Sequence, residues 1–172
     1  MRKIRTTTIS VLAIGLLAGS AIGVAAQGDS DGTLEPTLTS GSLVFSGSEP
    51  LSWEERLQDG VQTEDWVDSA AIEMSDPRLS GALTLDYTKQ RFDTRNTDLA
   101  WGSARIENDA GAWEGMMRQT SDRDALGAEV GYYELVGSGA YEGLSAIVFE
   151  TETPTDREWT GIIFPGDLPP DR

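Results

Sequence analysis

The sequence predicts an all-β, antiparallel fold of seven or eight strands, a closed barrel with a β-sandwich as the alternative. Three observations lead to this prediction. Apolar and polar residues alternate with period two, turn residues interrupt the alternation at short intervals, and no segment keeps a helical period. Seven or eight strands joined in sequence can bury their apolar faces only against one another, in a sandwich or in a closed ring.

The clearest strand is predicted at 79–87, where Leu83, Leu85 and Tyr87 share one face. Strands at 101–107 and 113–119 flank the turn 108–111, whose Asn, Asp and Gly residues accept the positive φ of a tight hairpin. Further strands are expected at 43–46, 65–74, 130–136, 144–151 and 159–164, whereas 53–57 has the alternative of one helical turn.

Glycines dominate the connector 137–143. Gly137, Gly139 and Gly143 predict a tight turn in which at least one glycine has positive φ, with Tyr141 buried beside Gly143. An aromatic residue also precedes a glycine by two positions at 45/47, 113/115, 141/143 and 159/161. We expect each of these rings to pack in the core beside the glycine, which has no side chain. The alternative is that a ring stacks on a sugar, which requires the ring to be exposed.

The N-terminus predicts a signal peptide over 1–26 and therefore a secreted protein. Arg2, Lys3 and Arg5 precede an uncharged apolar stretch, and the small residues at 24–26 suit signal peptidase, with Gln27 as the first mature residue. A single membrane anchor is the alternative. We expect a flexible linker at 27–41 and one β domain at 42–172.

The amino-acid composition excludes several classes of partner, catalytic site and metal site. The chain has 29 acidic and 13 basic side chains and a net charge of −16; without residues 1–26, which hold three basic and no acidic groups, the charge is −19. Such a charge repels nucleic acid and anionic lipid, so neither partner is expected after cleavage. The absence of His and Cys excludes Ser-His-Asp triads, disulfides and thiolate or imidazole zinc sites, and no cofactor or metal is expected.

Charged and tyrosine residues supply the candidate binding site. Pro77 fixes the backbone between Asp76 and Arg78, which orient a polar ligand at a barrel mouth or, alternatively, only cap a turn and form an ion pair. Tyr87, Arg105 and Tyr133 are the further ligand-binding candidates. The carboxylate pairs 122/124 and 150/152 suit acid–base chemistry, and Asp122 and Asp124 with nearby carbonyls suit calcium, but so acidic a chain produces such pairs by chance. No catalytic residue is identified.

Three segments carry a resemblance: SDPRLSG at 75–81, WGS at 101–103 with IENDAGAWEG at 106–115, and GSGAYEGL at 137–144. Together they resemble a signature of uncharacterised secreted bacterial proteins, and the last is similar to the glycine-rich turn of allene oxide cyclase and dirigent-type barrels. The resemblance implies an eight-stranded antiparallel closed barrel, a fold that often has a lumen able to hold a small apolar molecule. The cyclase's catalytic positions are not carried over, because their motifs are missing here.

The sequence therefore leaves two main functions open as alternatives. The first is a secreted barrel that binds a small apolar or aromatic ligand, or a surface glycan, without catalysis. The second is a lumen-based isomerase or cyclase, which requires polar groups that converge inside the barrel. A packed structural or interaction barrel is the third alternative, because the aromatic residues can simply fill the interior.

Overall fold

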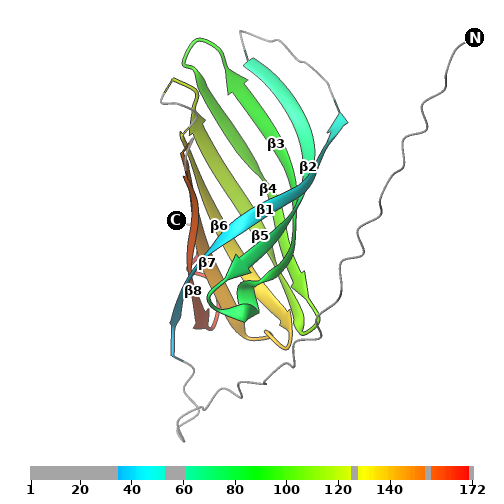
Figure 1. Ribbon diagram of the computed structural model, residues 1–172, viewed down its shortest axis with the longest axis vertical. Helices are drawn as coiled ribbons and strands as arrows, with labels where there is room; N and C mark the ends of the chain where they lie inside the picture. The colour runs from blue at the N-terminus through cyan, green and yellow to red at the C-terminus, as the bar shows by residue number, and fades with distance from the viewer. Residues whose placement is uncertain (1–34, 53–60, 125–127, 154–155, 171–172) are drawn as a thin grey trace, which may run out of the picture. The chain divides into compact units, whose positions relative to one another are not determined.

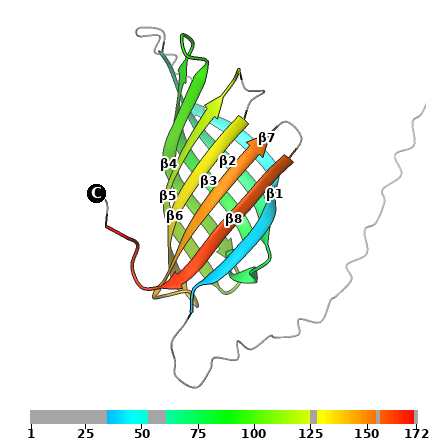
Figure 2. The ribbon, with the colours of Figure 1, turned by 90° about the vertical axis from the view of Figure 1, so that its left-hand side faces the viewer.

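The computed structural model describes residues 35–52, 61–124, 128–153 and 156–170. In these residues eight strands follow one another around a ring (Figures 1 and 2). The strands are β1 (Thr37–Ser52), β2 (Val61–Met74), β3 (Gly81–Phe92), β4 (Thr97–Asn108), β5 (Gly111–Asp122), β6 (Ala128–Gly139), β7 (Leu144–Thr153) and β8 (Asp156–Pro165). A 3-10 helix, η1 (Pro77–Leu79), separates β2 from β3. None of the described residues belongs to a helix long and apolar enough to cross a membrane.

Antiparallel pairing joins each strand to the next, and β1 also pairs with β8, from Thr37 opposite Ile163 to Gly41 opposite Trp159. The hydrogen-bonded ladder thus returns to its first strand, and we call this arrangement the strand ring. The all-β, antiparallel prediction is confirmed. Each strand has an inner face, which holds the buried side chains, and an outer face.

All eight strands are longer than predicted, and two boundaries differ for a clear physical reason. The strand expected at 79–87 begins at Gly81, because Asp76 caps η1 and Pro77 fixes its first turn. β1 begins at Thr37, so residues 37–41 of the predicted linker lie in the sheet. Their polar sequence is typical of a linker because they pair with β8 mainly through the backbone. The predicted signal peptide and the alternative helical turn at 53–57 lie outside the described residues.

The inner face is apolar at the end that carries η1. Its core includes Leu83, Leu85, Ile106, Leu135 and Ile163, all buried. Toward the other end the same alternation places charged groups inside, where the buried polar residues are Glu64, Asp68, Asp98 and Glu150. The interior is therefore divided into an apolar end and a polar end.

Tyr141 anchors the apolar end. Its ring stacks on Trp113 with ring centroids 5.2 Å apart, and its hydroxyl donates to Asn108 Oδ1 at 2.7 Å. Trp113 is fully buried, and its indole N–H donates to the Arg78 carbonyl at 2.7 Å. The predicted burial of Tyr141 is confirmed.

Positive φ occurs in one of the two predicted turns. Gly139 and Gly143 have φ of 67° and 80°, which confirms the prediction for the connector 137–143. No described residue of the turn 108–111 has positive φ. There the Asn108 side chain accepts hydrogen bonds from the N–H groups of Ala110 and Gly111, which stabilises the turn without a left-handed residue.

We expect Gly143→Ala to lower the free energy of unfolding by about 1–2 kcal/mol, because a β-carbon is strained at its positive φ although no atom lies near. Gly47→Ala is the control, since Gly47 also has open space around the added carbon but no positive φ. Urea denaturation of both variants measures the difference. Equal midpoints for the two variants would contradict the strained turn.

Tyr141→Ala should lower the free energy of unfolding by about 3–5 kcal/mol, because it removes a buried ring from its contact with Trp113. Tyr141→Phe should cost about 1 kcal/mol, since it removes only the hydrogen bond to Asn108. Thermal unfolding of both variants checks the order. Similar losses for the two would show that the hydroxyl, not the ring, stabilises this end.

Candidate functional site

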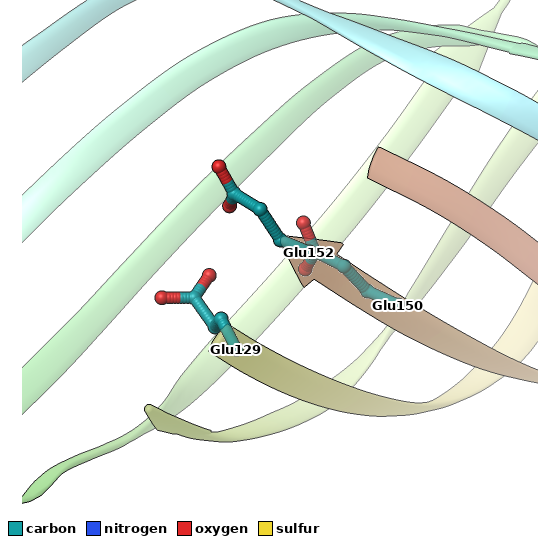
Figure 3. Close-up of side chains that lie close together, drawn as sticks. All are labelled: Glu129, Glu150 and Glu152. Atoms are coloured by element: carbon teal, nitrogen blue, oxygen red, sulfur yellow. The ribbon is translucent and has the colours of Figure 1, made fainter. Parts of the chain in front are cut away.

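Three glutamates meet at the polar end of the strand ring. Glu129 of β6 lies opposite Glu152 of β7, and Glu150 faces the same interior two residues before Glu152. Carboxylate oxygens of the three lie within 4.8 Å of one another (Figure 3). Glu150 is 2% exposed whereas Glu129 and Glu152 are half-buried, so this glutamate cluster extends from solvent into the interior.

Neighbouring side chains form hydrogen bonds and ion pairs with the carboxylates of the glutamate cluster. The Tyr133 hydroxyl donates to Glu150 Oε2 at 2.7 Å, and the Gln119 amide donates to Glu129 and, at 3.5 Å, to Glu150. Arg157 forms ion pairs with Glu150, at 3.7 Å from Nε to Oε1, and with Glu152. The cluster is thus an acidic group of three with one arginine.

Burial shifts the protonation of these groups. It raises the pKa of Glu150, while the hydrogen bond from Tyr133 and the charge of Arg157 act in the opposite direction. Burial also raises the pKa of Glu129, and the negative charge of Glu150 adds to this effect. The pKa of Tyr133 is raised well above its ordinary value by burial and by Glu150. Two carboxyl groups side by side therefore hold protons more tightly than they would in water.

Trp159 lines the same region, with its ring centroid 4.8 Å from that of Tyr133. Its indole N–H lies near enough to Glu150 to lower the pKa of that carboxyl, although it forms no hydrogen bond of ordinary geometry. The glutamate cluster thus has an aromatic wall, formed by Tyr133 and Trp159.

Other interior charges are paired across the strands. Tyr87 donates to Asp68 at 2.8 Å, and burial raises the pKa of Tyr87. Asp98 faces three basic groups, with Lys89, Arg91 and Arg123 nitrogens at 3.4, 3.6 and 3.3 Å from its oxygens. These contacts compensate buried charge, which is the usual requirement for keeping such groups inside a protein.

The candidate residues from the sequence lie in three separate places. Tyr87 and Tyr133 point into the polar end. Arg105 lies on the outer face beside Glu107 and Glu114. Asp76 and Arg78 lie at the opposite end of the strand ring, next to η1.

Asp76 and Arg78 form the turn and ion pair of the structural alternative. The Asp76 carboxylate caps η1 and lies 2.6 Å from the Arg78 guanidinium, which also donates to Thr37 at 3.1 Å. This hydrogen-bonded pair holds the pKa of Asp76 below its ordinary value. Both side chains are therefore engaged in connecting η1 to β1.

No local pattern in the sequence singles out Glu129, Gln119 or Arg157. The acidic composition makes the pair Glu150 and Glu152 expected by chance. A signal does exist: β7 alternates Ala146, Val148, Glu150 on its inner face, so the inward position changes from apolar to acidic within one strand. The opposing glutamate on β6 requires the strand register, which the sequence does not show.

The outer face of β4, β5 and β6 carries a hollow of about 490 Å³, which we call the outer groove. Its outward side chains are Leu99, Trp101, Arg118, Thr120, Val130 and Tyr132. Trp101 lies opposite Arg118, and Arg118 lies opposite Tyr132, so three strands contribute one row of side chains. Trp101 is 42% exposed, whereas Trp113, Tyr141 and Trp159, which each precede a glycine by two positions, are buried.

Comparison of the chain with protein-family models, with curated proteins and with solved structures finds no match. The likeness to allene oxide cyclase and dirigent-type barrels therefore stays a prediction. Function has to be argued from the glutamate cluster and the outer groove themselves.

The raised pKa of Glu129 predicts a pH-dependent stability. Its contribution to folding is complete below the unfolded pKa of 4.5 and is lost as pH rises through the higher folded pKa. Glu129→Gln cannot ionise, so the variant should gain stability relative to the wild type as pH rises from acid to neutral. Urea unfolding across this range measures the difference.

Glu142→Gln, in an exposed turn, is the control for that measurement. It removes one carboxylate outside the glutamate cluster, and it is measured beside the wild type at each pH. A difference between Glu129→Gln and wild type that stays constant with pH would contradict the raised pKa.

Proposed function

We propose that this protein is a secreted, non-catalytic glycan-binding module that binds its ligand in the outer groove. The proposal rests on one observation above all: Trp101 presents an exposed ring beside Tyr132 in a hollow of ligand size. Exposure of a ring is the condition that sugar stacking requires and that core packing does not meet.

The openness of the surface favours a glycan over an apolar small molecule. An apolar ligand gains affinity from burying most of its surface, which suits an enclosed cavity. A pyranose ring has apolar C–H faces and polar edges, so it can stack on an aromatic ring while its hydroxyl groups stay hydrated. Trp101 and Tyr132 stand two strands apart, about 10 Å at ordinary strand spacing, which suits successive sugars of one chain.

The inner face supports the same conclusion. Leu83 and Leu85, which the sequence placed on the wall of a lumen, belong to the packed core, as do Ala104 and Ile106 of the neighbouring strand. At the polar end the described carboxylates pair with Arg157, Lys89 and Tyr133. A ligand inside would have to displace these contacts, whereas the outer groove is open to solvent.

The closed barrel and the secreted location are parts of this proposal. The pairing of β1 with β8 supports closure, since a closed ring protects strand edges and keeps the outer face rigid. The basic N-terminus before an apolar stretch supports export, and the acidic composition suits solubility outside the cell.

Substitution of the two aromatic residues of the outer groove tests the proposal. Trp101→Ala and Tyr132→Ala should each weaken binding by about tenfold or more, because a central aromatic residue of a binding surface contributes about 2 kcal/mol. Affinity electrophoresis in gels that contain single soluble polysaccharides, followed by calorimetry on the one that retards the protein, gives the affinities.

Leu38→Ala is the matched control, because the Leu38 side chain on β1 is 80% exposed and lies outside the groove. It should bind like the wild type. Absence of retardation across neutral and acidic polysaccharides, or retention of binding by Trp101→Ala, would refute the proposal.

A second candidate function is acid–base catalysis at the glutamate cluster. The observation in its favour is the adjacent Glu129 and Glu150, both with raised pKa, beside the Tyr133 hydroxyl. A catalytic role requires that a molecule larger than water reaches Glu150.

Carbodiimide coupling of an amine to the folded protein, mapped by mass spectrometry, tests that access. Modification of Glu150 along with Glu129 and Glu152 would favour catalysis. Protection of Glu150 while the other two react would leave the cluster a structural one.

A further inference from the structure

We infer that the outer groove selects a glycan that carries a carboxylate, and that Arg118 is the residue that pairs with it. This inference rests on the proposed glycan-binding function and names its ligand class. Three features carry it: the unpaired charge of Arg118, its place between two aromatic rings, and the acidity of the rest of the chain.

Arg118 differs from the other basic residues of the described strands. Lys89, Arg91, Arg105 and Arg157 each lie within 4 Å of a carboxylate. Among the residues that the structure describes, Arg118 has neither an ion pair nor a hydrogen bond from its side chain. In a chain with 29 acidic and 13 basic groups an exposed guanidinium without a carboxylate is available for one from a ligand.

The position of Arg118 suits a substituent on a stacked sugar. The register places its α-carbon opposite Trp101 on one side and opposite Tyr132 on the other. Directly opposed side chains on one face begin about 5 Å apart, so a sugar on either ring brings its edge over the guanidinium. The planar guanidinium can hold a carboxylate through two parallel hydrogen bonds.

Two contacts hold the Tyr132 side chain in place beside Arg118. Its hydroxyl donates to Glu134 at 2.9 Å, and its ring packs against Phe149 with centroids 5.2 Å apart. Glu134 thereby places a negative charge two residues along β6 from the groove. A second carboxylate at that end of the ligand would be repelled.

Charge therefore favours one carboxylate on the glycan and disfavours further ones. A net charge of −16 repels a polyanion over long range, while contact with Arg118 acts over a few ångströms. The preferred glycan has a single uronate in an otherwise neutral chain. A polyuronate gains the same contact and meets repulsion from its remaining charges.

A matched pair of sugars tests the inference on the full protein. Methyl β-glucuronide and methyl β-glucoside differ only in a carboxylate against a hydroxymethyl group, and binding is followed by NMR through the Trp101 indole N–H. The wild type should bind the glucuronide at least about fivefold more tightly, since a hydrogen-bonded charge pair contributes to affinity.

Arg118→Gln should bind both sugars with the affinity that the wild type has for the glucoside. Arg105→Gln, on the same outer face but already paired with Glu107, should keep the wild-type preference. Trigalacturonate should bind no more tightly than methyl galacturonide, and tighter binding would overturn the limit to a single carboxylate.

The outcomes separate the two proposals. Equal binding of glucuronide and glucoside, unchanged in Arg118→Gln, would overturn the carboxylate preference and leave the glycan-binding function standing. No saturable shift of Trp101 with either sugar would overturn both. Loss of the preference in Arg118→Gln alone, with the Trp101 shift retained, supports the pairing.

Discussion

The antiparallel pairing of β1 with β8 is the constraint on which the rest of the structure depends. It joins the last strand to the first, so each strand acquires one face turned inward and one turned to solvent. Because side chains alternate along a strand, the register of this ring decides every burial at once. A shift by one residue would turn Trp159 and Ile163 outward and expose the core they complete.

The inner face also explains why the two ends of the strand ring differ. Near η1, the stacked Trp113 and Tyr141 and the surrounding aliphatic residues exclude water and stabilise the fold. At the far end the inward positions are Glu129, Glu150 and Asp98, whose charges require partners once they are buried. We expect the apolar end to carry most of the stability and the polar end to respond to pH.

On the outer face, folding does not by itself require Trp101 to be exposed. Exposing a large ring gives up the burial that stabilises Trp113, and we propose that a ligand in the outer groove accounts for the place of Trp101. Trp101, Arg118 and Tyr132 come from three strands and meet only through the register. Their alignment is the kind of arrangement that a chain of sugars requires.

The sequence by itself determined the all-β class, the succession of strands, the glycine turn with positive φ and the burial of Tyr141, because alternation and turn chemistry are local properties. It also showed the acidic composition, from which we expect repulsion of polyanionic partners. Only the tertiary structure decided which candidates meet: it put Tyr133 beside Glu150, turned Arg105 to solvent and brought Arg118 between two rings. Strand pairing sets these neighbours, and pairing depends on contacts between residues far apart in the chain, which no local pattern contains.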